Sequence, residues 1–248
     1  FNLSSMRVVY QSVWFDFSRR VIVALDTPSL DKVKSLVKEL VLHTPTTSRS
    51  AWSSRHGSAR RKQSHACMAL VARSFSTESD DIPNTVGGAA AGIVALNVAM
   101  FNVHASAGRA SLEAAVANKK DSLLLGVTVL TSIDDEECVS IFGNMPGEKV
   151  LQFTRMLKVA GADGIICSPQ ELELLSQHGE FDNMRKVIPG VRPYWATSGD
   201  QRRVMTPGNT VLAGADHLVI GRPVTNPPKE IGGPSDAIQL ILEENQLE

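Results

Sequence analysis

Short apolar runs, separated by amphipathic stretches, constrain the fold of this chain more than any other feature of its sequence. Residues 21–26 are apolar up to a final carboxylate, Asp26, as expected for a strand buried on both faces of a parallel sheet. Similar runs predict five further strands, at residues 100–104, 122–130, 164–167, 184–189 and 217–220. They recur at about the 30-residue period of a β/α repeat.

Helical patterns separate the predicted strands. Apolar residues recur along one helical face in five segments, at residues 30–40, 85–98, 107–116, 146–160 and 235–247. Ser168 and Pro169 have the residue types of an N-cap and a first helical position, and Thr206-Pro207 opens another helix. Residues 42–81 leave room for two more strands. The pattern favours an α/β fold, the eight-stranded (β/α)8 TIM barrel, over a doubly wound sheet, whose Gly-rich first turn is absent.

Composition and charge narrow the classes of function. The 248 residues are 43% apolar and 21% charged, as in a globular protein with a sizeable core. The formal net charge of −1 creates no field that would attract nucleic acid or an anionic membrane, and no apolar run approaches the roughly 20 residues of a membrane span. Cys67, Cys138 and Cys167 lack a CxxC partner, which argues against a zinc site and favours a reducing compartment. We therefore expect a cytoplasmic location, with neither nucleic acid nor membrane as a partner.

Two segments depart from the β/α pattern. Residues 1–20 combine several Ser with Arg7, Arg19 and Arg20, and we interpret them as an N-terminal extension. Residues 41–80 are Ser-rich and basic, with acids only near their end, and neither helical nor strand periodicity persists there. Their composition is typical of a disordered basic linker. The expected organisation is an extension followed by a single barrel domain at 21–248, with 41–80 anomalous.

Polar residues follow the predicted strands, where β/α-barrels place their catalytic groups. They are Asp26, Asp81, His104, Thr131, Ser132, Ser168, Arg192 and Arg222. Gly221 and Arg222 after the last strand suit a phosphate group, although an arginine in an ion pair at the barrel rim would give the same pattern. Residues 189–203 form a polar loop with three arginines, which suits a lid over a phosphorylated substrate or a solvated loop without a role. For His104, a structural histidine is expected more than a general base. No second histidine lies at metal-ligand spacing from it.

With these residues in view, the chain resembles the orotidine 5'-phosphate decarboxylase family, in its bacterial-type length class. The matching segments are VIVALD, DIPNTV, VHASAGRASLEAAV, LLLGVTVLTS, DGIICSPQELELL, PGVRP, GDQRRVMTP and GADHLVIGRPVT. The resemblance covers nearly all of residues 21–42 and 81–248. It implies a (β/α)8 homodimer with shared active sites that converts orotidine 5'-phosphate to UMP and CO₂ in pyrimidine biosynthesis, with no metal and no organic cofactor.

The same resemblance assigns roles to individual residues. Asp26 would bind the ribose, while Asp81, Ile82 and Thr85 would reach into the active site of the partner subunit. Thr131 and Ser132 would face the pyrimidine. The phosphate would be held by a set of four residues, Arg192, Gln201, Gly221 and Arg222.

One motif of the family is incomplete in this chain. The family pattern is D-x-K-x-x-D-I-P-x-T, and its second Asp corresponds to Asp81, so Ser76 and Glu78 occupy the positions of the first Asp and the catalytic Lys. A second family Lys would fall near residues 48–49, where no comparable strand is predicted. Glu78 would add an anion beside Asp81 and supply no proton at neutral pH, so the chain as written is predicted to be nearly inactive.

The flanks of residues 41–80 match the family while the segment itself does not. Because its length is close to that of the family but its apolar pattern is lost, we hypothesise a frame-shifted or mis-spliced reading of barrel strands two and three. Two alternatives to an active decarboxylase remain: an enzyme similar to hexulose-phosphate synthase, and a non-catalytic nucleotide-binding protein.

Overall fold

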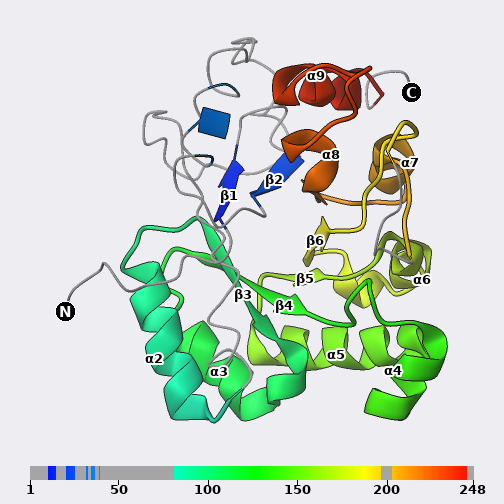
Figure 1. The fold of residues 1–248 in the computed structure, drawn as a ribbon. Helices are drawn as coiled ribbons and strands as arrows, with labels where there is room; N and C mark the ends of the chain where they lie inside the picture. The colour runs from blue at the N-terminus through cyan, green and yellow to red at the C-terminus, as the bar shows by residue number, and fades with distance from the viewer. Residues whose placement is uncertain are drawn as a thin grey trace.

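A single sheet with parallel central strands organises the molecule. The computed structural model describes residues 11–14, 21–25, 81–196 and 203–244, together with residues 32, 35, 36 and 39, which are helical. The sheet has seven strands in the order β1-β2-β7-β6-β5-β4-β3 (Figure 1). The strands are β1 (Gln11–Trp14), β2 (Val21–Leu25), β3 (Met100–His104), β4 (Leu123–Val127), β5 (Gly164–Ile166), β6 (Arg185–Ile188) and β7 (His217–Ile220).

The strand order is that of a barrel opened between β3 and β2. From β3 to β7, each strand pairs in parallel with the next strand along the chain, and β2 pairs in parallel with β7. These six parallel strands are the six that the sequence predicted, so the predicted α/β class is confirmed. The other two strands of an eight-stranded barrel would fall in residues 41–80, which lie outside the described residues. What the structure describes is therefore a half-barrel.

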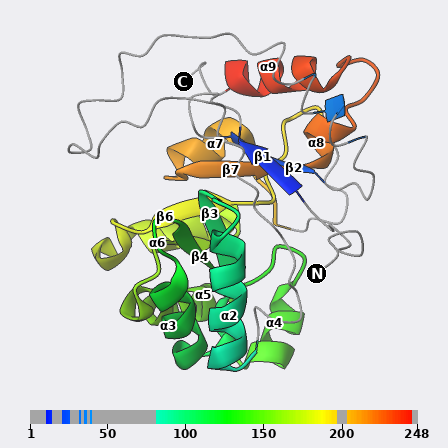
Figure 2. The same cartoon turned by 90° about the vertical axis from the view of Figure 1, so that its left-hand side faces the viewer.

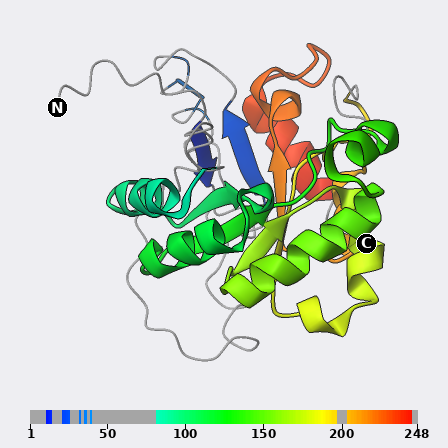
Figure 3. The same cartoon turned by 90° about the horizontal axis from the view of Figure 1, so that it is seen from below.

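Helices cover the outer face of this half-barrel. In chain order they are α2 (Pro83–Val94), α3 (Arg109–Asn118), α4 (Asp135–Phe142), α5 (Pro146–Ala160), α6 (Leu172–Ser176), α7 (Pro207–Leu212), α8 (Arg222–Thr225) and α9 (Pro234–Glu244). Short 3-10 turns occur at η2 (Ala105–Ala107), η3 (Pro169–Glu171) and η4 (Gly179–Phe181). Figures 2 and 3 show α2, α3 and α5 side by side along one flank, whereas α7, α8 and α9 lie near β7 and β2.

The strands bury both of their faces, which explains their unbroken apolar sequences. On the outer face, residues such as Leu124 and Ile165 join helix residues such as Leu112 and Leu157 in one large buried cluster. The opposite face holds a smaller cluster made of strand residues alone: Ile22, Met100, Leu125 and Val187, with Leu123, Ile166 and Val219 packed against them. Strand alternation therefore separates a helix-covered surface from the barrel interior.

The motif Gly-Ala-Asp occurs before β5 and again before β7, and both copies make the same contacts. The carboxylate of Asp163 accepts a 2.8 Å hydrogen bond from the Leu124 backbone N–H, and Asp216 accepts one of 2.8 Å from Lys186. Each aspartate also donates its own N–H to the carbonyl of the same strand residue, at 2.9 Å. These paired bonds satisfy backbone groups at the amino ends of the strands, so the motif fixes where neighbouring strands start.

Most elements follow the sequence predictions. The strand predicted at 100–104 and the helix predicted at 146–160 coincide with β3 and α5 at both ends. Among the described helices and strands, α4, α8 and β1 were not predicted. The strand β1 lies within the residues interpreted as an extension and pairs antiparallel with β2. The described part of the chain contains no helix that is long and apolar enough to cross a membrane.

Candidate active site

The carboxyl ends of the six parallel strands meet at one edge of the sheet, and most predicted site residues follow these ends. His104 ends β3, Thr131 and Ser132 follow β4, and Ser168 follows β5. Arg192 follows β6, and Gly221 with Arg222 follows β7. Four further positions of the sequence prediction, Asp26, Ser76, Glu78 and Gln201, lie outside the described residues.

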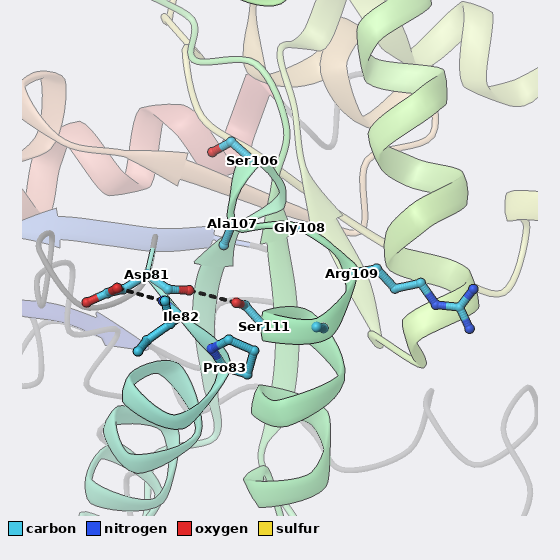
Figure 4. A pocket seen from close by; sticks show the side chains of 9 residues that line it. Asp81, Ile82, Pro83, Ser106, Ala107, Gly108, Arg109 and Ser111 are labelled. Carbon is cyan, nitrogen blue, oxygen red and sulfur yellow. Dashed lines mark hydrogen bonds between the residues drawn. The ribbon is translucent and has the colours of Figure 1, made fainter.

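Asp81 lies at the carboxyl end of β3 because its backbone is tied to the helix that follows this strand. The hydroxyl of Ser111, in the first turn of α3, donates a 2.6 Å hydrogen bond to the Asp81 carbonyl (Figure 4). The Asp81 carboxylate accepts a 2.6 Å bond from the Ile82 backbone N–H. Ile82 is the N-cap residue of α2, Pro83 occupies its first position, and Thr85 lies in its first turn. The loop thus presents an exposed carboxylate beside a well-formed helix start.

A pocket of about 500 Å³ lies next to this loop. It is lined by Asp81, Ile82, Pro83, Ser106, Ala107, Gly108, Arg109, Ala110 and Ser111. Most of these residues are exposed, so the pocket is an open hollow. Figure 4 shows the Arg109 side chain directed away from Asp81, and its Nε atom contacts the Glu113 carboxylate at 2.7 Å. Asp81 therefore places a carboxylate at the side of the hollow formed by the loop before α2.

Two backbone contacts close the base of the long loop after β6. Val191 and Met205 form a parallel bridge, and the Arg192 N–H donates a 2.9 Å hydrogen bond to the Met205 carbonyl. The Arg192 side chain is buried, and its Nη1 atom donates to the Val191 carbonyl at 3.0 Å. The two ends of residues 192–205 are consequently held together beside β6.

Arg203, at the end of the same loop, contacts the segments that follow two other strands, β5 and β4. The Arg203 guanidinium contacts the Glu171 carboxylate in η3, and its Nη2 atom donates a 2.9 Å hydrogen bond to the Leu130 carbonyl after β4. Burial raises the pKa of Glu171 to about 7, while Arg203 and the hydrogen bonds from Ser168 act to lower it. The sequence predictions assigned no individual role to Glu171 and included Arg203 only as one of the three arginines of the possible lid.

After β7, the chain turns directly into the short helix α8. Gly221 is its N-cap, and the Gly221 carbonyl accepts hydrogen bonds from Val224 and Thr225 at 2.9 and 3.1 Å. Arg222 is the first helical residue and is exposed. The predicted strand end is confirmed, whereas phosphate binding by this turn remains a prediction. Ser168 is confirmed as an N-cap, because its hydroxyl accepts a 3.3 Å bond from the Gln170 N–H.

The described part of the chain holds two cysteines, and its acidic, histidine and cysteine residues do not form clusters of metal-ligating size. Cys138 and Cys167 are buried free thiols, and burial raises the pKa of both, so each is protonated and unreactive near neutral pH. No group of three or more His, Cys, Asp or Glu residues that could hold a metal occurs among the residues described.

A known protein family matches the part of the chain that forms this sheet edge. Residues 80–231 match the model of the orotidine 5'-phosphate decarboxylase / HUMPS family. The chain belongs to this family. The match begins one residue before Asp81 and includes every described strand from β3 to β7. All of the predicted site residues from Asp81 to Arg222 thus lie within the part shared with the orotidine 5'-phosphate decarboxylase / HUMPS family.

Individual members of the family are similar over the same region. An orotidine 5'-phosphate decarboxylase from Haemophilus ducreyi is 46% identical over 151 residues, which are 58% of this chain and 65% of the relative. One from Pasteurella multocida is 42% identical over 167 residues, or 65% of this chain and 70% of the relative. The crystal structure of orotidine 5'-phosphate decarboxylase from Lactobacillus acidophilus superposes with a TM-score of 0.54 at 33% identity, covering 66% of this chain and 71% of that chain. The chain therefore matches less than two thirds of the length of the Haemophilus relative.

Sequence reasoning missed three residues whose contacts shape the candidate site, Ser111, Glu171 and Arg203. Ser111 anchors the Asp81 loop, but a serine within a helical pattern carries no distinguishing signal. Glu171 and Arg203 lay in the segments CSPQE and GDQRR, where the predictions concerned the Ser168 cap, a possible lid and Gln201. The contact between Glu171 and Arg203 could be found only from the fold, because 31 residues separate the two in sequence and they follow different strands.

Proposed function

We propose that the carboxyl edge of this half-barrel binds orotidine 5'-phosphate and its product UMP, and that the chain derives from an orotidine 5'-phosphate decarboxylase. The observation that carries the proposal is the family match over residues 80–231, together with the gathering of the matching polar residues at one sheet edge. Two of the relatives quoted above are named for this reaction. An edge of this kind is where β/α-barrels carry their active sites.

The proposed binding roles follow the chain's own positions. Thr131 and Ser132, after β4, face the pyrimidine, and Asp26 binds the ribose. The phosphate is held after β6 and β7 by Arg192, Gln201, Gly221 and Arg222. The buried Arg192 supports this assignment, because a guanidinium held beside a strand end is suited to an anion and cannot lose its charge.

We also propose a homodimer in which Asp81, Ile82 and Thr85 of one subunit enter the site of the other. Ile82 supports this arrangement because it is 64% exposed at the start of α2. Such exposure is unusual for a large apolar residue outside an interface. A cytoplasmic location is part of the same proposal, since the buried thiols of Cys138 and Cys167 are unpaired.

Decarboxylation in this family uses an Asp and a Lys that the sequence of this chain lacks. Decarboxylation breaks the bond between C6 of the pyrimidine and its carboxylate, leaves the electron pair on C6, and needs a proton there. A cation held among carboxylates would stabilise that charge and supply the proton. Asp81 is present, but Ser76 and Glu78 replace the family's first Asp and its Lys. We therefore propose that the chain as written binds nucleotide and is nearly inactive.

Calorimetric titration with UMP and a decarboxylation assay test both parts of the proposal. The chain is expected to bind UMP more tightly than uridine, which lacks the phosphate, and to show almost no turnover. The double substitution Ser76→Asp, Glu78→Lys should raise turnover by about 10²-fold or more, the usual contribution of a positioned acid. Rapid turnover by the unmodified chain would contradict the inactivity, and absence of UMP binding would contradict the substrate assignment.

The origin of residues 41–80 can be tested on the nucleic acid. Translating the gene and transcript across these codons in all three frames should reveal a D-x-K-x-x-D segment leading into Asp81. If no frame encodes it, the frame-shift hypothesis is wrong. The second candidate function, a nucleotide-binding protein without catalysis, is favoured by Glu78 itself, and UMP binding without any gain in the double variant would support it.

A further inference from the structure

Arg203 connects three separate parts of the half-barrel edge. Its guanidinium contacts Glu171, which belongs to the turn after β5, and donates to the carbonyl of Leu130, which follows β4. Arg203 itself belongs to the chain that returns from β6 toward α7. One side chain thus links the segments that follow β4 and β5 to the end of the segment between β6 and α7.

The pair is buried to a degree that is unusual for charged residues. The side chains of Arg203 and Glu171 are only 7% and 6% exposed. One polar atom of each, Nε of Arg203 and Oε2 of Glu171, has no hydrogen-bond partner. Burying such a pair costs desolvation energy that its mutual attraction only partly offsets, and apolar residues of similar size often stabilise a fold equally well. Stability alone is therefore a weak reason for the pair.

Its neighbours in the chain suggest a different role. Leu130 immediately precedes Thr131 and Ser132, which are proposed to face the pyrimidine. Two residues beyond Arg203, Met205 accepts the N–H of Arg192, which is proposed to hold the phosphate. The same anchor therefore fixes the backbone on the pyrimidine side and the backbone on the phosphate side.

We propose that Glu171 and Arg203 are positioning residues that hold these two sides of the nucleotide site at a fixed separation. The inference rests on the proposed nucleotide function and extends it to residues that do not touch the ligand. Glu171 holds the guanidinium in place, and the forked guanidinium reaches the Leu130 carbonyl at the same time. A lysine at 203 would keep the charge but could not make both contacts in this geometry.

UMP affinity, measured by calorimetry, tests the proposal in three variants. Arg203→Lys and Glu171→Gln should each weaken UMP binding about tenfold or more, as for loss of a charge-assisted hydrogen bond. The third variant, Glu171→Met with Arg203→Met, replaces the ion pair by apolar side chains of similar length. It should unfold at a temperature close to that of the parent chain, yet still bind UMP about tenfold more weakly.

A second Arg–Glu pair provides the matched control. Arg155 Nε contacts Glu180 at 3.0 Å, but this pair is about half exposed and joins α5 to η4. Arg155→Gln should leave UMP affinity unchanged. The positioning role is overturned if the folded double-Met variant binds UMP as tightly as the parent, since the pair would then contribute only to stability. If the parent itself binds no UMP, the proposed function fails and the positioning role falls with it.

Discussion

At Glu171, burial and a neighbouring guanidinium act on one carboxyl group in opposite directions. Burial is the larger influence and raises the pKa to about 7 from an ordinary value of 4.5. The charged side chain that acts on this carboxyl group is Arg203, which lowers its pKa. Between about pH 4.5 and about pH 7, Glu171 is consequently protonated in the folded chain and ionised in the unfolded chain.

The stability of the protein should therefore depend on pH through this residue. Because the folded-state pKa lies above the unfolded one, the contribution is fully present below about pH 4.5 and is lost as the pH rises through about 7. Thermal unfolding at about pH 5 and about pH 8 should show a decrease in stability that flattens in Glu171→Gln. Glu180→Gln, at an exposed position, should retain the decrease. An unchanged pH dependence in Glu171→Gln would contradict the assignment.

Single residues were the hardest level to predict from sequence. Ser168 was predicted correctly as an N-cap because Ser-Pro is a strong helix start, a local signal. The catalytic role of Asp81 stays a prediction. Glu171 and Arg203 gave no such signal, since charged residues in a polar loop are usually solvated. Their burial results from the meeting of connections after different strands, which only the three-dimensional order of the sheet determines.

Among the secondary-structure elements, β5 and β6 approach so closely that one position admits no side chain. A Cβ atom on Gly164 would collide with the carbonyl oxygen of Arg185 and lie 2.8 Å from the Arg185 Cβ. Because the obstacle is the backbone of the paired strand, it cannot move aside without separating the two strands. Gly88, on the exposed side of α2, has no atom within 4 Å of such a Cβ.

The two glycines should respond to alanine in opposite ways. Gly164→Ala should destabilise the fold by about 2 kcal/mol or more, through overpacking and loss of strand pairing. Gly88→Ala should stabilise it by about 0.5–1 kcal/mol, because alanine favours a helix interior. Denaturant unfolding of both variants measures the difference. Equal effects would mean that β5 and β6 are not packed as described.

Element boundaries were predictable where capping residues mark them. Pro146 opens α5 and Gly161, with φ of 89°, closes it, and both ends agree with the prediction. The helix α4 was missed because it has eight residues and buries only Cys138, so its apolar periodicity is too short to recognise. Its start is nevertheless a standard cap, in which Asp134 accepts a 2.9 Å bond from the Glu137 N–H.

For the whole molecule, the alternation of strands and helices was sufficient to predict the class of fold and the sheet edge at which the candidate residues gather. Parallel strands joined by helices place all carboxyl ends together, so the gathering of Thr131, Ser168 and Arg222 at one edge followed from topology. The pairing of β1 with β2 did not follow, because residues 1–20 have no strand pattern. Asp26 and Gln201 lie outside the described residues, and their roles stay predictions.

The proposed dimer predicts a difference between two exposed apolar residues of the α2 region. Ile82 precedes the helix and is 64% exposed, and Leu96 follows it and is 63% exposed. If Ile82 enters the partner's site, Ile82→Ser should shift the protein toward monomer, by about tenfold or more in dissociation constant, as for a buried interface residue. Leu96→Ser should not. Sedimentation measurements over a range of concentrations distinguish them, and equal behaviour would place the interface elsewhere.

The pairing of β2 with β7 also bears on the order in which the chain can fold. From β3 onward, each strand finds its neighbour shortly after synthesis, since the neighbour is the next strand to be made. Among the described strands, the first parallel strand, β2, pairs with the last, β7, across almost the entire chain. Contacts between such distant segments form slowly. Until β7 leaves the ribosome, the apolar residues Val21, Ile22 and Val23 lack the parallel partner strand that the described part of the chain gives them. Apolar strand surface exposed in this way favours aggregation.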